Sequence, residues 1–290
     1  MRGAFSPWYA EKPFSKLPGK RHMANQRSRI ITLLTDFGIH DAYTGIMKGV
    51  IAGINPHANI IDLCHMIPPQ DVFRGAYILY TSYQYFPKGT IHIAVIDPGV
   101  GSERNILCAE CKGHLFLAPD NGLLSFILQK EKTKTITRVT NTKFFLPGQS
   151  NTFHGRDIFA PVAAHLSLGI LPDQLGRKIN QFRQIDMPNP VFAKENRRIN
   201  GTILSIDHFG NLITNITEKD IDNLETTTNN LILTVDNEKI KGLSNTYADV
   251  KTGMPLMFIG SAGFLEISVN QGNAKKHFRA KQGHKVYLDA

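Results

Sequence analysis

Four short segments of the chain place acidic, basic or amide side chains beside glycines. They are residues 35–38, 97–104, 153–157 and 207–211. Glycine lets the backbone turn sharply and approach a ligand closely, and loops that follow regular elements often carry function. For each segment taken alone, the alternative is an aspartate that only caps a turn. Four such segments in one chain favour a functional site.

Residues 97–104, D-P-G-V-G-S-E-R, follow an apolar run that begins at Ile91. Its β-branched residues predict a buried strand, and Pro98 ends that strand because proline donates no ladder hydrogen bond. Asp97 is therefore expected at the carboxyl end of a strand, where open α/β sheets bind their ligands.

Three of the side chains in these segments suit the activation of a water molecule. Asp97 supplies a carboxylate, Arg104 a fixed cation and His154 a proton carrier. Arginine can stabilise hydroxide while histidine or aspartate takes the proton. The sequence contains no G-x-S-x-G, Walker or G-x-G-x-x-G motif that would indicate a serine hydrolase, a P-loop or a dinucleotide site.

Three further side chains suit the binding of a nucleoside. Asp36 and Asp207 can accept hydrogen bonds from vicinal hydroxyls such as a ribose diol. Asn211 offers an amide to a nucleobase edge or a carboxylate.

The elements that must position these residues alternate along the first hundred residues. Apolar runs at 29–35, 59–67 and 91–96 predict strands, and helical periodicity between them predicts helices that start at Asp41 and Asp71 as N-caps. This order predicts an α/β fold with a parallel or mixed central sheet. In the first helix, Gly45, Gly49 and Gly53 recur every fourth residue and predict close backbone packing.

Beyond residue 198 the pattern changes to short strands with turn signals, which predicts a small all-β, barrel-like domain. We therefore expect a basic, poorly ordered extension over residues 1–28 and an N-terminal α/β domain over 29–185. A linker over 186–198 and a C-terminal β domain over 199–290 complete this division. Met23 is an alternative start of the chain.

Charge and composition disfavour several classes of partner. The net charge is +9, but the first 29 residues carry +6 of it. The remainder has no Arg/Lys-rich helix, so nucleic acid is not an expected partner. No apolar run is long enough to cross a membrane, and the start lacks the apolar stretch of a secretory signal. We expect a cytoplasmic protein.

The three cysteines, Cys64, Cys108 and Cys111, form no disulfide framework, which fits a reducing compartment. Cys108 and Cys111 make a lone C-x-x-C without the second ligand pair that a zinc site needs. We expect two strand cysteines and no metal, with zinc binding as the alternative.

Seven segments from residue 35 to residue 270 together resemble one known family. They are T-D-F-G-I-H-D-A-Y-T-G-I-M-K-G, D-L-C-H-M-I-P-P-Q-D-V, D-P-G-V-G-S-E-R, A-P-D-N-G-L-L, F-H-G-R-D-I-F-A-P, D-H-F-G-N-L-I-T-N and G-F-L-E-I-S-V-N. In this order they resemble the S-adenosyl-methionine hydroxide adenosyltransferases, relatives of the bacterial fluorinase and chlorinase. The resemblance implies that water displaces L-methionine from C5′ of S-adenosyl-methionine and gives adenosine, without a cofactor.

The resemblance also implies roles for individual residues. Asp97, Arg104 and His154 would activate the water, and Asp36 would hold the ribose. The other implied positions contact the methionine or adenosine parts, with Asp207 at the methionine ammonium: Asp41, Tyr43, Phe153, Gly155, Asp207, Asn211, Tyr247, Ser261 and Asn270. Family members form trimers in which two subunits share each site, so a homotrimer is expected.

Two alternative functions remain open at this point. One is a chlorinase-like halogenase, because Gly155 matches the chlorinase more than the fluorinase. The halogenases, however, carry Tyr where Asp97 stands. A carboxylate beside the nucleophile would repel a halide, which favours water. The other is a binding protein for S-adenosyl-methionine or a nucleoside, which would need Asp36 and Asp207 but not the complete set of Asp97, Arg104 and His154.

Overall fold

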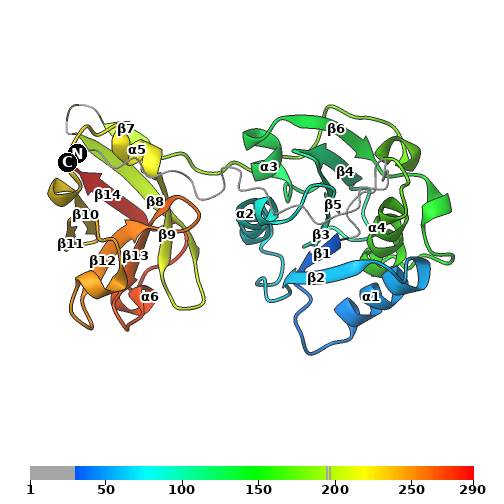
Figure 1. Cartoon of the computed structure of the whole chain (residues 1–290), viewed down its shortest axis with the longest axis horizontal. Helices are drawn as coiled ribbons and strands as arrows, with labels where there is room; N and C mark the ends of the chain where they lie inside the picture. The colour runs from blue at the N-terminus through cyan, green and yellow to red at the C-terminus, as the bar shows by residue number, and fades with distance from the viewer. Residues whose placement is uncertain (1–29, 194, 196) are drawn as a thin grey trace, which may run out of the picture.

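The computed structural model describes residues 30–193, 195 and 197–290. The predicted extension over residues 1–28 lies outside this part of the chain. The described residues form an α/β part and, after it, an all-β part (Figure 1).

The α/β part contains a six-stranded sheet in the order β2-β1-β3-β5-β4-β6, and the prediction of a parallel or mixed sheet is confirmed, since the sheet is mixed. Strands β1, β2, β3 and β5 run parallel, and β4 runs antiparallel to both of its neighbours. The strands are β1 (Ile30–Thr35), β2 (Asn59–Cys64), β3 (Ile91–Val95), β4 (Ile106–Cys111), β5 (His114–Pro119) and β6 (Thr133–Arg138).

Helices cover both faces of this sheet (Figure 1). On one face, α1 (Tyr43–Ile54) and α4 (Ala160–Ser167) pack together, and Met47 and Ile51 of α1 are buried in one core cluster with Ile31 and Ile93. On the other face lie α2 (Val72–Ser82) and α3 (Ser125–Lys130), which belong to a second cluster. The strands are apolar on both sides because both faces are buried.

The two predicted N-caps have different outcomes. Asp71 caps α2, since its side chain accepts a hydrogen bond from the backbone N–H of Arg74. The prediction for Asp41 is wrong: Ala42 occupies the N-cap of α1 and no side chain caps that helix.

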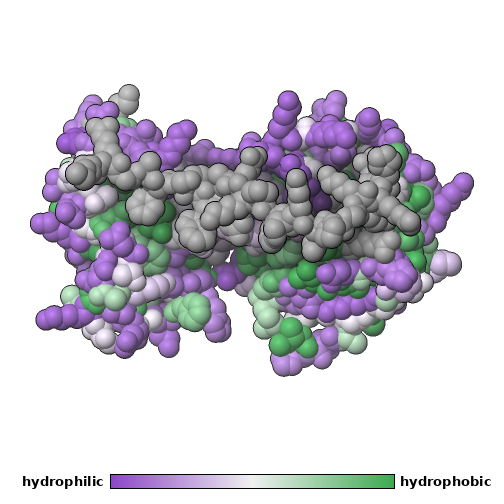
Figure 2. Space-filling model, in the orientation of Figure 1, coloured by the Kyte–Doolittle hydropathy of each residue, from purple (hydrophilic) through white to green (hydrophobic). Residues whose placement is uncertain are grey.

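The prediction of close packing along the α1 glycines is also wrong within this chain. A β-carbon added at Gly45, Gly49 or Gly53 would meet nothing within 4 Å. These glycines lie on the outer side of α1, where Tyr43 is 48% and Ile46 is 40% exposed. Figure 2 shows hydrophobic residues gathered on the α/β part, over β2 and the loop before α1.

The all-β part is an eight-stranded sheet in the order β11-β10-β14-β8-β9-β13-β12, with β7 paired to β8. An isolated bridge between Leu243 and Met257 joins its two ends, so the sheet nearly closes into a barrel. The strands are β7 (Val191–Ala193), β8 (Arg198–Ile206), β9 (Leu212–Thr217), β10 (Ile232–Val235), β11 (Glu238–Lys241), β12 (Pro255–Ile259), β13 (Phe264–Val269) and β14 (Lys285–Asp289). Two short helices, α5 (Glu218–Asp222) and α6 (Ala274–His277), accompany it. Strand β7 falls inside the segment predicted as a linker.

Helix α2 lies on the side of the α/β part that faces the all-β part and contacts it (Figure 1). Nη1 of Arg74 donates to Oγ of Ser205 at 3.0 Å and to the carbonyl of Ile206 at 2.7 Å. The rings of Tyr77 and Phe264 lie 6.1 Å apart. Among the described residues, none of the helices has the length and apolar character needed to cross a membrane.

Candidate active site

Asp36 and Asp97 follow two neighbouring strands at the same edge of the mixed sheet. Thr35, the last residue of β1, pairs in register with Val95, the last residue of β3. Asp36 comes directly after β1, and Asp97 comes two residues after β3. The structure therefore places both carboxylates at the carboxyl edge of the parallel strands, as the sequence predicts.

Arg104 folds back onto Asp97. Its Nε donates to Oδ1 and Oδ2 of Asp97 at 2.9 and 2.8 Å, and its Nη2 also donates to Oδ2. The side chains of Arg104 and Asp97 are 9% and 4% exposed. Such charge-assisted, forked contacts are stronger than neutral hydrogen bonds and fix the orientation of both groups.

His154 reaches the same pair from a π-helix over Gly155–Phe159, which continues into α4. Its Nδ1 lies 2.8 Å from Nη2 of Arg104. Guanidinium has only donors, so Nδ1 accepts this bond and the neutral ring carries its proton on Nε2. Burial and the charge of Arg104 lower the pKa of His154, although Asp97 and Asp157 act in the opposite direction. His154 is therefore neutral at pH 7.

A cavity of about 430 Å³ opens beside this cluster and is lined by residues between positions 36 and 155. The lining includes the predicted residues Asp36, Tyr43, Asp97, Phe153, His154 and Gly155. Arg104 lies behind the wall, bonded to both Asp97 and His154. The cavity thus combines two carboxylates, an imidazole and aromatic side chains.

Three aromatic rings pack together in the cavity wall. The centroid of Tyr43 lies 5.8 Å from that of Phe37 and 5.2 Å from that of Phe153, and Phe37 and Phe153 are 6.0 Å apart. Such a wall offers apolar surface to a planar ring or an aliphatic chain. Oδ2 of Asp36 accepts the N–H of Gln70 at 2.8 Å, which orients this carboxylate.

Asp207, Asn211 and Tyr247 form a second group, in the all-β part. Nδ2 of Asn211 donates to Oδ2 of Asp207 at 2.8 Å and lies 3.2 Å from the hydroxyl of Tyr247. The structure brings these three predicted residues together, but the cavity beside Asp97 is lined only by residues of the α/β part.

The remaining predicted residues lie outside that cavity lining as well. Asp41 is exposed in the loop before α1, and Ser261 is exposed between β12 and β13. Nδ2 of Asn270 donates to the carbonyl of Val250 at 2.8 Å, so this side chain holds a neighbouring loop.

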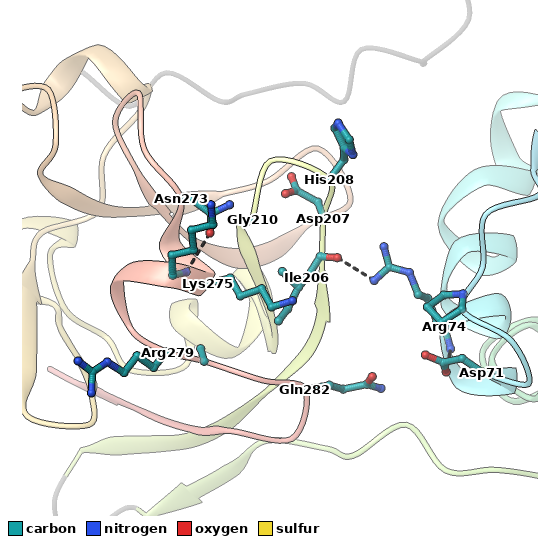
Figure 3. Close-up of a pocket in the computed structure, with 13 residues that line it drawn as sticks. Asp71, Arg74, Ile206, Asp207, His208, Gly210, Asn273, Lys275, Arg279 and Gln282 are labelled. Carbon is teal, nitrogen blue, oxygen red and sulfur yellow. Dashed lines mark hydrogen bonds between the residues drawn. The ribbon is translucent and has the colours of Figure 1, made fainter.

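A larger cavity of about 600 Å³ lies where the two parts of the chain meet (Figure 3). Arg74 points across it to the carbonyl of Ile206, and Asp207 and His208 lie on its rim. Its lining includes neither Asp97 nor His154. The larger of these two cavities is therefore not the one beside the cluster of Asp97, Arg104 and His154.

Phe37 and Gln70 line the smaller cavity but are missing from the predicted site. Phe37 had a sequence signal, because it lies between Asp36 and Gly38 in one of the four segments. Gln70 lies in the segment from Asp62 to Val72 that resembles the family, but its contact with Asp36 had no signal of its own, because a backbone N–H makes it with a carboxylate 34 residues earlier.

The C-x-x-C pair lies in β4, and its two thiols face opposite sides of the sheet. Cys108 belongs to the core cluster under α1 and α4, and Cys111 to the cluster under α2 and α3. The two sulfurs therefore do not form a shared metal site. Across residues 30–193, 195 and 197–290, no group of three or more His, Cys, Asp or Glu is arranged to hold a metal ion.

Taken together, the fold and site define a two-part protein, α/β and then all-β, with a cavity at the edge of its mixed sheet. The chain belongs to the SAM hydroxide adenosyltransferase family: the model of the family's N-terminal domain matches residues 31–176 and that of its C-terminal domain matches 201–287. SAM is S-adenosyl-L-methionine.

Individual relatives cover nearly the whole chain. The (R)-S-adenosyl-L-methionine hydrolase of Thermus thermophilus is 34% identical over 90% of this chain and 99% of its own length. A fluorinase from Actinopolyspora mzabensis is 26% identical over 91% and 98%. The crystal structure of an uncharacterized conserved protein from Thermotoga maritima superimposes with a TM-score of 0.85, at 35% identity over 90% of this chain and all of that one.

Proposed function

We propose that this protein hydrolyses S-adenosyl-L-methionine to adenosine and L-methionine. One observation carries the proposal: Arg104 bonds both Asp97 and His154 at the wall of a cavity that also contains Asp36. The hydrolases among the family's relatives support the same reaction. A binding protein for the same ligand would not need this complete set of three ionisable groups.

The reaction is a displacement at C5′ of the ribose. A bond forms between the water oxygen and C5′, the bond between C5′ and sulfur breaks, and its electron pair stays on sulfur. Methionine leaves as a neutral thioether, so its departure needs no acid and no metal. The protein's task is to align a desolvated water opposite the C–S bond.

Asp97 is the proposed acceptor of the proton that the water loses. Nδ1 of neutral His154 already accepts from Arg104, and Nε2 carries the ring proton, so the imidazole is a donor toward the cavity. The Asp97 carboxylate lines the cavity and retains acceptor capacity beside its bonds to Arg104. The guanidinium stabilises the negative charge that develops on the oxygen.

Incubation with S-adenosyl-L-methionine in ¹⁸O-labelled water tests this function. The expected products are L-methionine and adenosine with ¹⁸O at the 5′ position, in equal amounts and unaffected by a chelator. Unchanged substrate after long incubation would reject hydrolysis in favour of a binding protein. A 5′-halogenated adenosine formed at modest halide concentration would support the halogenase instead.

The R configuration at sulfur is the proposed substrate form, because the names of the hydrolase relatives specify it. Separated R and S sulfonium epimers distinguish the two cases. A higher kcat/KM is expected for the R epimer, and equal values for both would reject this preference.

We also propose a homotrimer in which two subunits share each site. Each chain has two separate groups of predicted residues, one around Asp97 and one around Asp207. Exposed aromatic residues accompany both groups, with Tyr43 at 48% and Phe209 at 72% exposure. Contact between copies would cover such residues and complete the site. The three cysteines form no disulfide among the described residues, which fits a cytoplasmic location.

A further inference from the structure

The turn that follows β5 contains two polar residues, Asp120 and Asn121, for which the reaction above gives no role. Nδ2 of Asn121 donates to the carbonyl of Ile96 at 2.8 Å. Its Oδ1 accepts the N–H of Leu123 at 3.2 Å. Ile96 is fully buried and directly precedes Asp97. Asn121 therefore supplies the hydrogen-bond donor for a buried backbone carbonyl at the start of the 97–104 loop.

Asp120 holds the other end of the same loop. Its N–H donates to the carbonyl of Asn105 at 2.9 Å, and Nδ2 of Asn105 donates to Oδ2 of Asp120 at 3.0 Å. Asn105 directly follows Arg104. Oδ1 of Asp120 accepts the N–H of Arg183 at 2.7 Å, so a backbone segment outside the sheet also holds this aspartate in place.

The position of β5 explains how one turn reaches both ends. In the sheet, β5 lies between β3, where the loop starts, and β4, where it ends. Inside the loop, Oγ of Ser102 donates to the carbonyl of Gly99 at 2.7 Å and accepts the N–H of Arg104 at 3.3 Å. These internal bonds shape the loop but do not tie it to the sheet.

We propose that Asp120 and Asn121 are positioning residues, which hold both ends of the 97–104 loop and so place Asp97 and Arg104 against His154. This inference rests on the proposed function for its effect on catalysis. Asp120 and Asn121 do not line the cavity, whereas Asp36 and the aromatic wall do. A shifted loop should therefore lower kcat much more than it changes KM, because it misplaces the water while Asp36 and the aromatic wall, which lie outside the loop, keep their positions.

Asn121→Asp is the sharpest variant. It keeps an acceptor for the N–H of Leu123 and puts an oxygen where the donor to Ile96 was. Asn141→Asp is a matched control: Nδ2 of Asn141 donates to the carbonyl of Gln174 at 2.8 Å and its Oδ1 accepts the N–H of Lys143 at 3.2 Å. This second turn lies outside the cavity lining.

The readouts are kcat and KM for S-adenosyl-L-methionine and the titration of His154 by NMR. In Asn121→Asp, kcat should fall about 10- to 100-fold, as a misplacement near 1 Å produces, with KM little changed. The pKa of His154 should rise toward its ordinary value, because Arg104 no longer lies against it. Asn141→Asp should change neither readout.

Equal kcat values and equal His154 titrations in the two variants would overturn the inference. If Asn121→Asp does not fold, Asn105→Ala removes only the bond to Oδ2 of Asp120, and an unchanged kcat in that variant would overturn it equally. If the unsubstituted protein does not turn over S-adenosyl-L-methionine, the proposed function fails, while the NMR titration still decides whether Asn121 positions Arg104.

Discussion

Gly101 lies against the carbonyl oxygen of Asn151, so closely that a β-carbon on Gly101 would be 2.5 Å from that oxygen. Gly101 belongs to the loop that carries Asp97 and Arg104, and Asn151 belongs to the segment that leads to His154. The two loops of the proposed catalytic cluster therefore touch at a position where only glycine fits.

The first prediction concerns this contact. Gly101 and Gly148 have similar positive φ angles of +78° and +68°, but a β-carbon on Gly148 would meet nothing within 4 Å. Gly148→Ala should cost about 1–2 kcal/mol in the free energy of unfolding from backbone strain alone. Gly101→Ala should cost more and also lower kcat, because the two loops must separate. Urea unfolding and steady-state kinetics check this, and full activity in Gly101→Ala would contradict it.

The second prediction concerns the proposed base. Asp97→Asn keeps the shape of the side chain but removes its charge, so kcat should fall by about 10²- to 10⁴-fold, the usual contribution of a general base. The exposed Asp173→Asn serves as the control and should retain the kcat of the unsubstituted protein. If Asp97→Asn loses less than tenfold, the proton acceptor is another group.

The third prediction is a pH dependence of activity. Burial and Arg104 lower the pKa of His154 below its ordinary value of 6.5, so the ring stays neutral as the pH falls through 6.5. On the acid side, loss of kcat/KM by protonation of His154 should therefore begin below pH 6.5. A profile of kcat/KM from pH 5 to 8 measures this, and a half-maximal point at or above pH 7 on the acid side would contradict it.

The fourth prediction is a pH dependence of stability. His92 is fully buried between Thr32 and His114. Burial, together with His114, lowers the pKa of His92 to about 3 from 6.5. Between pH 6.5 and pH 3 this histidine is protonated in the unfolded chain but not in the folded one. The contribution of neutral His92 to the free energy of unfolding is therefore fully present above pH 6.5 and decreases as the pH falls toward 3.

Urea midpoints at pH 7.5 and pH 5 measure this decrease in stability. The His92→Gln variant should show a smaller difference between the two midpoints, whereas His57→Gln, at an exposed position, should keep the original difference. Equal midpoints at both pH values in the unsubstituted protein would contradict the prediction.

The fifth prediction tests whether subunits share the site. His154→Ala and Asp207→Ala should each be inactive alone. When equal amounts of the two variants are mixed under conditions that exchange subunits, about a quarter of the sites in a cyclic trimer combine two intact halves. The mixture should therefore recover about a quarter of the activity of the unsubstituted protein. A mixture of His154→Ala with Asp97→Ala is the control and should stay inactive, because both changes affect the same half.

Much of the fold is readable from local patterns. The apolar runs before Asp36 and Asp97 predict β1 and β3 because such runs favour buried parallel strands. Asp71 predicts the start of α2 correctly, while Asp41 carries the same signal and does not cap α1. The difference lies in the backbone conformation around residue 42, which the identity of one aspartate does not determine.

The candidate site is predictable where it depends on strand ends. Asp97, Arg104 and His154 meet as expected because the loops that carry them leave the same region of the sheet. The contact between Gln70 and Asp36 was not predictable, because a backbone N–H has no sequence signature. The spacing of the α1 glycines predicted close packing, but spacing alone does not show whether another element of the chain lies against them, and none does within 4 Å among the described residues.

The apolar core under α2 and α3 bears on whether the α/β part can be produced without the all-β part. The core cluster on this face includes Leu204, Ile213 and Phe264 from the all-β part together with α2 and α3. A fragment that ended at residue 185 would expose this apolar surface and lose both bonds of Arg74 to the following part. The α/β half is therefore expected to aggregate when expressed alone, and screens for inhibitors or crystals should use the intact chain.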